Sequence, residues 1–413
     1  MASCGAPSDM RNLIGRLRRP ISRSQLTKTL ALISDGDGST LSLDFTAMSG
    51  LDSRFTFSRA STATFINSSG LVESAANGVA RFDHDPATLA PRGLLIEGSA
   101  TNFCIRSQEI NTSNWTIGGN TTLTQNTSDV ADPAGGNTAT KIVLSANAYC
   151  SRAQQIFVAG NTQYTFSFWI RGTSGITSRI YSFAGFAGDL VTQTAYSYST
   201  TGWTRVQTTF TTNASTTGIY VYVASKSTAV GSTDTIYVWG AQLEAGSGAS
   251  SYIPTGSGTV QRAADSCVMT GTNFSSWFNS TAGTFLATGE RAITSDFGRL
   301  LSANANNTTS AFDLGASTNG RWLITNTTSQ ADITAGTVTA NTAFKVAGAF
   351  ANNDAQMAFN GTLGTADTSV SLPNVSQLDI GADRTAVYLN GRIRSIKFWP
   401  TRLPDATLQS LTA

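Results

Sequence analysis

The sequence has few charged residues for its length, with Asp, Glu, Lys and Arg together making up 13% of its 413 residues. Its formal net charge is only +2. This excludes the strong overall field with which a basic protein attracts nucleic acid or an anionic membrane surface. No apolar run approaches the roughly 20 residues that cross a bilayer, so we expect no membrane insertion. The first residues, MASCGAPSDM, contain no apolar segment, so we expect no export signal.

Cysteine is also scarce. The four cysteines are widely spaced and form no CxxC pair: Cys4, Cys104, Cys150 and Cys267. This pattern excludes a zinc knuckle and a scaffold built on dense disulfides, and it favours buried free thiols in a protein made in a reducing cytoplasm. The segment 35–37 begins like a calcium loop but lacks the downstream Glu. We therefore predict no metal site and no cofactor, and leave a single structural calcium open.

Short alternating apolar runs, separated by loops rich in Ser, Thr, Asn and Gly, recur along the chain. They predict an all-β fold, and the length predicts more than one core. The middle of the chain contains seven predicted strands: Thr138–Leu144, Gln154–Val158, Tyr164–Arg171, Arg179–Phe183, Thr204–Thr212, Gly218–Ala224 and Thr235–Gln242. Regular short strands of this kind indicate an antiparallel sandwich or jelly roll.

The stretch Val238–Thr255, VWGAQLEAGSGASSYIPT, divides the chain. It reads as a last strand, a Gly/Ser turn and an exit segment that Pro254 keeps out of any ladder. A second all-β region follows, with hairpin signals at Asn360-Gly361 and Asn390-Gly391 and a short terminal helix over Leu403–Leu411.

We thus predict two β-sandwich, jelly-roll-like domains in tandem after a short helical or extended N-terminal segment. The expected parts are a docking segment at 1–40, a small β unit at 41–105, a jelly-roll domain at 106–262 and a second sandwich at 263–413. The first part carries a basic run: Arg11, Arg16, Arg18, Arg19 and Arg23. Such a run suits a nucleic-acid arm or a segment that docks on a partner subunit. No aromatic residue accompanies these arginines, which favours docking and no nucleic acid.

Several runs resemble segments of bacteriophage virion proteins of the tail-fibre, spike and head-fibre type: SRASTATF, RFDHDP, RGLLIEGSATN, GAQLEAGS with SYIPT, and VQRAAD. The strand order before Thr255 resembles jelly-roll carbohydrate-binding modules, and the C-terminal run resembles a laminin-G or concanavalin-type sandwich. The resemblance implies a virion protein assembled in the host cytoplasm. It also implies a homotrimer that attaches to tail or capsid (portal vertex) proteins and binds host cell-surface polysaccharide.

Aromatic and arginine side chains outside the predicted core are the candidates for glycan contact, because sugars stack their C–H faces on aromatic rings. We name six: Trp169, Arg171, Tyr220, Tyr222, Trp115 and Trp203. The first four are on the outward positions of their predicted strands, and the last two lie near loops. The alternative for each is packing against another domain or another copy of the chain.

The sequence gives little support to catalysis. His84 is the only histidine, and no GxSxG elbow accompanies it. The acidic residues form no tight pair of the kind a glycosidase needs: Glu73, Asp83, Asp85, Glu97, Glu109, Asp189, Asp234, Glu244 and Glu290. We therefore predict no catalytic residue and no enzyme. Two other readings stay open, a virion decoration or joint protein that binds only other virion proteins, and a polysaccharide depolymerase.

Overall fold

The computed structural model describes residues 36–119, 121–144, 150–172, 177–182, 190–195, 199–226, 234–292, 296–383 and 387–413. The N-terminal arginines of the predicted docking segment lie outside these ranges. Within them the chain is almost entirely antiparallel β-structure, which confirms the predicted fold class. The described helices are short: α3 (Thr272–Ser275) and α4 (Asp405–Thr412). No helix in the described residues is long and apolar enough to cross a bilayer.

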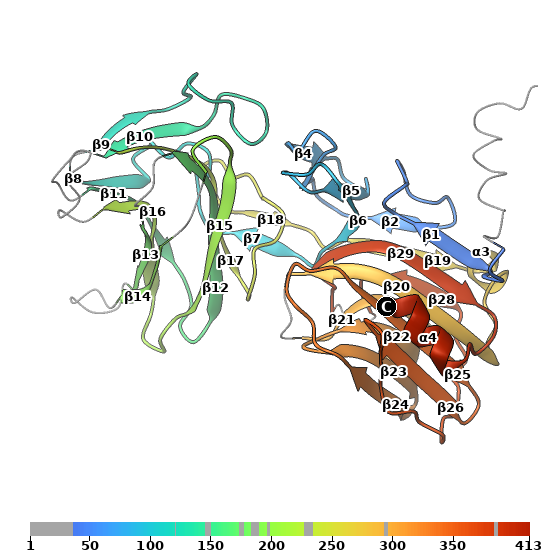
Figure 1. Ribbon diagram of the computed structural model, residues 1–413. Helices are drawn as coiled ribbons and strands as arrows, with labels where there is room; N and C mark the ends of the chain where they lie inside the picture. The colour runs from blue at the N-terminus through green and yellow to red at the C-terminus, as the bar shows by residue number, and fades with distance from the viewer. Residues whose placement is uncertain are drawn as a thin grey trace, which may run out of the picture.

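Figure 1 shows two β-sandwiches side by side, and the smaller one is called the module here. The module has two five-stranded sheets. Its near sheet faces the larger sandwich and contains β15 (Thr204–Thr211), β12 (Gln163–Gly172), β17 (Asp234–Ala245), β10 (Thr140–Leu144) and β9 (Thr121–Thr124). Its far sheet contains β14 (Leu190–Ala195), β13 (Thr177–Ser182), β16 (Gly218–Lys226), β11 (Cys150–Phe157) and β8 (Trp115–Gly119). Each of the seven strands predicted from the sequence overlaps one of these.

The larger sandwich has an eight-stranded and a seven-stranded sheet. The first contains β27 (Thr362–Leu363), β26 (Asp354–Phe359), β25 (Phe344–Ala351), β20 (Ala282–Arg291), β29 (Gly391–Trp399), β6 (Pro91–Ile96) and β5 (Arg81–His84), with β1 (Leu41–Asp44) also paired to β29. The second contains β2 (Thr56–Ser58), β19 (Ser266–Thr270), β28 (Gln377–Ile380), β21 (Gly298–Asn304), β22 (Ser310–Ala316), β23 (Gly320–Asn326) and β24 (Thr328–Ala335).

The pairing differs from the tandem order that we expected. Strands β1, β2, β5 and β6 come from the predicted small unit at 41–105, yet they lie in the two sheets of the larger sandwich. The module is therefore inserted into this sandwich. The chain leaves through β7 (Ala100–Asn102) and returns through β18 (Val260–Arg262), which pair with each other. Alternating apolar residues predict where strands form, but they do not say which distant strand each one pairs with.

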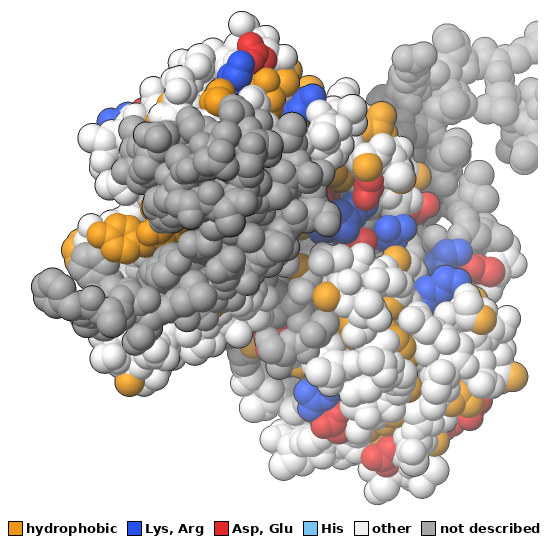
Figure 2. Space-filling view, turned by 60° about the vertical axis from the view of Figure 1, so that its left-hand side comes forward, with side chains coloured by type: hydrophobic (Ala, Val, Ile, Leu, Met, Phe, Trp, Pro, Cys, Tyr) orange, Lys and Arg blue, Asp and Glu red, His pale blue; other side chains and the backbone are white. Residues whose placement is uncertain are grey.

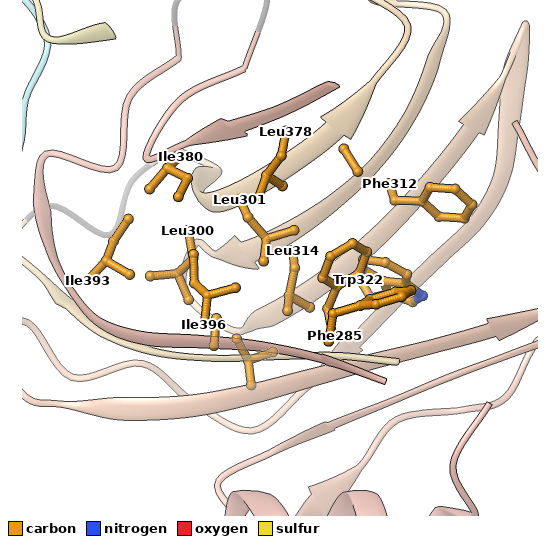
Figure 3. Close-up of a cluster of buried hydrophobic side chains, with 14 of the residues drawn as sticks. Phe285, Leu300, Leu301, Phe312, Leu314, Trp322, Leu378, Ile380, Ile393 and Ile396 are labelled. Atoms are coloured by element: carbon orange, nitrogen blue, oxygen red, sulfur yellow. The ribbon is translucent and has the colours of Figure 1, made fainter. Parts of the chain in front are cut away.

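Side chains from both sheets fill the larger sandwich. Figure 3 shows Phe285 and Trp322 close together between the sheets, with Phe312 beyond them. Phe285 comes from one sheet and Trp322 from the other, and their ring centroids lie 6.2 Å apart. The module has its own core, in which Phe166, Phe168 and Ile170 alternate along β12 as the sequence predicted. Each of the two sandwiches thus has an apolar core of its own, separate from the contacts between them.

A hairpin of β3 (Ala63–Ile66) and β4 (Val72–Ala75) fills part of the space between the two bodies. Its Val72 N–H donates to the carbonyl of Pro133 in the module at 2.8 Å. The Thr64 hydroxyl donates to the carbonyl of Tyr252 in the exit segment at 2.6 Å. The hairpin therefore ties the module to the chain that precedes it.

Candidate functional site

The outer face of the near sheet is covered. Trp169 on β12 and Trp239 on β17 meet edge to face at 5.2 Å, and Tyr252 of the exit segment packs on both, at 5.5 Å and 4.7 Å. Ile66 and Val72 of the β3–β4 hairpin complete this cluster. An aromatic group that fills a joint between elements cannot also offer its face to a sugar ring. The near sheet is therefore used for docking inside the chain.

This covering changes the interpretation of Trp169. The predicted register is right, because the ring points away from the module core, but the side chain is only 7% exposed. The guanidinium of Arg205 lies 4.5 Å above the ring. Gly240 on β17 has a positive φ of 64°, and a Cβ there would come within 2.9 Å of the Trp169 ring. The packing alternative therefore holds for Trp169 in this structure.

The other loop tryptophans and Arg171 also contact their own chain. Trp115 is 1% exposed in the module core, and its indole N–H donates to the carbonyl of Arg106 at 3.3 Å. Trp203 is half-buried against the aromatic cluster, and its N–H donates to the carbonyl of Ala131 at 2.8 Å. Arg171 is half-buried and reaches the carbonyl of Thr200 at 3.4 Å. Trp115, which we expected near a loop and outside the core, is thus a core residue at the start of β8.

The far sheet faces away from the larger sandwich (Figure 1) and holds the two remaining candidates. Tyr220 and Tyr222 on β16 are half-buried, with ring centroids 6.5 Å apart. On the neighbouring strand β11, Gln155 is exposed and accepts the Tyr220 hydroxyl at 3.5 Å. Phe157, two residues further along β11, is 75% exposed. These four residues are called the far-sheet strip here.

The far-sheet strip has the chemistry that a sugar requires. Tyrosine and phenylalanine rings offer flat apolar faces, and the Gln155 amide offers a donor and an acceptor to hydroxyl groups. Backbone pairing places Gln155 opposite Tyr220 and Ala153 opposite Tyr222, so the rings follow the strand direction. On the other side of β16, the positions of Tyr181 and Arg179 pair with Tyr220 and Tyr222. Gln155 and Phe157 were missed because an isolated polar or apolar residue at a strand end carries no sequence signal.

A second group of polar side chains lies buried where the module joins the sandwich. Glu97 accepts Arg81 at 2.8 Å and Arg262 at 2.5 Å, and Asp265 accepts Arg81 at 2.6 Å and Arg59 at 3.1 Å. All five side chains are at most 4% exposed. They are called the junction network here. Its members come from four of the five sequence runs that resemble phage virion proteins. Those runs therefore form the buried contact that joins the module to the larger sandwich.

The junction network binds the exit segment directly. Ser251 donates its N–H and its hydroxyl to Glu97, at 2.7 Å and 2.6 Å. Burial alone would raise the pKa of the Glu97 carboxyl, but Arg262 and Arg81 hold that pKa well below its ordinary value. Glu244 on β17 is in the opposite position. Burial raises its pKa, although Ser250 and Gln242 donate hydrogen bonds to it.

Three of the acidic residues that looked scattered in the sequence meet at one pocket. Asp83, Glu97 and Glu244 all line it. Asp83 pairs with Arg392 at 2.5 Å, and Glu97 is held by the junction network, so both carboxylates are occupied by arginines of the same chain. His84 is half-buried in β5 and does not line the pocket. Within the described residues, no group of three His, Cys, Asp or Glu side chains could hold a metal.

One family model matches part of the chain, within the inserted module. Residues 105–233 match the family described as carbohydrate binding domain. This range covers β8 to β16, including both strands of the far-sheet strip. No curated protein sequence matches the chain at a significant level.

Among solved structures, the chain is similar to the CBM40 domain of a Ruminococcus gnavus sialidase bound to sialyllactose. The identity is 16%, the match covers 34% of this chain and 88% of that one, and the TM-score is 0.31. It is also similar to the enzymatically active domain of tailspike protein 4 of bacteriophage CBA120, with 16% identity over 35% of this chain and 21% of that one and a TM-score of 0.28. Domain 4 of a Geobacillus stearothermophilus arabinanase gives 11% identity, 40% and 82% coverage, and a TM-score of 0.31. Identities this low do not indicate which ligand this chain binds.

Proposed function

We propose that this chain, whose residues 105–233 are a carbohydrate-binding module, is a subunit of a bacteriophage fibre or spike that adheres to host-surface glycan without cleaving it. The observation that carries the proposal is the unequal use of the two module sheets. The near sheet is docked on the rest of the chain by Trp169, Trp239 and Tyr252, whereas the far sheet presents tyrosines and Phe157 on the side away from the sandwich (Figure 1). A module held by one face can bind a ligand with the other.

The virion role rests on the resemblance of the junction runs to phage fibre and spike proteins. In this proposal the chain is a homotrimer that attaches to tail or capsid proteins through the basic N-terminal segment, after assembly in the host cytoplasm. Several copies on one particle raise the effective concentration of each weak glycan site, so modest affinity per module suffices for attachment. A decoration protein that binds only virion proteins would need no ligand on the far sheet.

A glycan array probed with the full chain tests the adhesion. We expect binding to a subset of polysaccharides, and we expect a Tyr220→Ala/Tyr222→Ala double variant to lose about tenfold or more in affinity, because each ring contact is worth roughly 0.5–1.5 kcal/mol. Tyr237→Ala is the matched control, since Tyr237 lies on the near sheet and bonds Asp129 at 3.1 Å. Equal binding by the double variant and the parent would refute the far-sheet strip as the site.

A depolymerase is the weaker alternative, although one observation speaks for it. Glu97 and Glu244 line one pocket, and their pKa values are displaced in opposite directions. However, Arg81, Arg262 and Ser251 already occupy Glu97, and Ser250 and Gln242 occupy Glu244. We therefore expect no release of reducing ends from any polysaccharide that the array identifies. Release that Glu244→Gln abolishes would establish the enzyme instead.

A further inference from the structure

The pocket between the module and the larger sandwich has a volume of about 140 Å³. A cavity of this size holds on the order of ten water molecules. Its walls come from three parts of the chain: the β3–β4 hairpin, the module with its exit segment, and the sandwich near β6 and β29. Figure 2 shows several blue and red side chains gathered where the two bodies meet. The pocket therefore exists only when the module is docked, and it is separate from the far-sheet strip.

Two clusters in which arginines outnumber carboxylates lie at this pocket, although the side chains that line it are balanced: Arg205, Arg262 and Arg392 with Asp83, Glu97 and Glu244. On one side, the junction network shares two carboxylates among three arginines. On the other side, a second cluster also has three arginines for two carboxylates, namely Arg92, Arg392 and Arg394 with Asp83 and Glu290. An excess of positive charge on low-dielectric walls focuses the field and raises the local concentration of anions.

Arg205 adds a cation that no carboxylate of the described chain pairs with. Its two terminal nitrogens donate to neutral oxygens, the Ser250 carbonyl at 2.8 Å and the Ser167 hydroxyl at 3.1 Å. The Trp169 ring holds the guanidinium from below at 4.5 Å. Glu244 also lines the pocket and attracts Arg205 electrostatically, but it forms no ion pair with it, and burial favours the neutral form of Glu244. The wall at Arg205 thus offers a guanidinium that is held in place and has no carboxylate of the described residues within ion-pair distance.

The rest of the wall suits a sugar. Ser99 and Asn390 supply groups that can bond hydroxyls, and Ile66 and Ala249 supply apolar surface. The rings of Trp169 and Tyr252 are used in the aromatic cluster of the near sheet. Pockets of this mixed kind, mostly apolar with a few polar groups, occur preferentially at domain interfaces. We propose that the pocket is a second carbohydrate site, which binds a carboxylate-bearing sugar residue with its carboxylate towards Arg205. The site would let the chain select acidic polysaccharides, whatever the far-sheet strip binds.

The test measures binding of glucuronic acid and glucose to the full chain by calorimetry at low salt. We expect glucuronic acid to bind and glucose to bind at least tenfold more weakly. Arg205→Gln should weaken glucuronic acid roughly tenfold, since it removes a charge-assisted contact, and Arg205→Lys, which keeps the charge but not the stacked planar group, should lose less affinity than Arg205→Gln. Equal affinities for the two sugars, or no binding of either at millimolar concentration, would overturn the proposal. Acetate that binds as well as glucuronic acid would overturn the sugar assignment.

Two further variants separate this site from the far-sheet strip and from folding effects. Ala249→Phe fills the pocket from a half-exposed position without removing any charge, and it should abolish glucuronic acid binding. The Tyr220→Ala/Tyr222→Ala variant should leave that binding unchanged. Unaltered binding in Ala249→Phe would refute the location even if Arg205→Gln did not fold. Loss of array binding in the tyrosine variant with intact glucuronic acid binding would show that the two sites are independent.

Discussion

Replacing Glu97 by Gln tests whether the junction network holds the module in place. The amide has the shape of the carboxylate but not its charge, so Arg262 would stay buried without a carboxylate and Arg81 would keep only Asp265. Breaking a buried ion pair by changing one member costs about 3–5 kcal/mol, because the other charge is left uncompensated. We expect the free energy of unfolding at pH 7 to fall by about this amount.

The stability difference between the parent and Glu97→Gln should also depend on pH in a defined direction. Arg262 and Arg81 hold the pKa of Glu97 below its ordinary value, so its contribution to stability is present above the unfolded-state pKa of about 4.3 and is lost as the pH falls through the folded-state value. The difference in stability between the parent and Glu97→Gln should therefore be largest near neutral pH and should shrink in acid below about pH 4.

Urea unfolding at pH 7 and in acid, followed by tryptophan fluorescence, measures the loss of unfolding free energy and its change with pH. Glu109→Gln is the control, because Glu109 pairs with Arg106 at the same 2.8 Å but with side chains 45% and 36% exposed. Such a surface pair is worth at most about 1 kcal/mol. Similar losses of unfolding free energy in the two variants at pH 7 would refute the proposal that the junction network holds the module in place. A difference between the parent and Glu97→Gln that did not change with pH would refute it as well.

Three more outcomes follow from the structure. Burial raises the pKa of Glu244, so folding favours its protonated form. The contribution of Glu244 to stability is full in acid and is lost as the pH rises through its folded-state pKa. Glu244→Gln should therefore be at least as stable as the parent in urea at pH 8. A Cβ at Gly348 would lie 2.5 Å from the Trp322 ring, so Gly348→Ala should lower the unfolding free energy by about 1–3 kcal/mol, and an unchanged urea midpoint would contradict this. Burial raises the pKa of the Cys104 and Cys267 thiols, so iodoacetamide at pH 8 should modify both only after denaturation, as peptide mass spectrometry would show.

The sequence was most informative about strands with strict alternation. Along β12, the apolar positions from Tyr164 to Ile170 predicted the core face correctly, because a period of two leaves only one face for the module interior. The terminal helix was predicted over Leu403–Leu411 and is found as α4 (Asp405–Thr412), with Pro404 just before it. Local turn and helix signals of this kind depend on neighbouring residues, so they can be read without the fold.

The insertion and the sites could not be predicted in the same way. Pairing of β6 with β29 joins residues about three hundred positions apart, and the sequence of neither strand identifies the other as its partner. The outward position of Trp169 was predicted, but its covering by Tyr252 and the β3–β4 hairpin depends on that long-range topology. The junction runs were recognised from resemblance, yet only the structure shows that Glu97, Arg262 and their partners form one buried set.

The insertion has a mechanical consequence. Strand β1 runs beside β29, β29 runs beside β6, and β6 leads directly to β7 at the foot of the module. Tension between an anchored N-terminus and a ligand on the far sheet would pass along these adjacent strands. Hydrogen bonds that lie across the pulling direction are strained together in shear instead of opening one after another. A tether of this design would resist detachment under flow, with β29 near the C-terminus carrying the pull between β1 and β6.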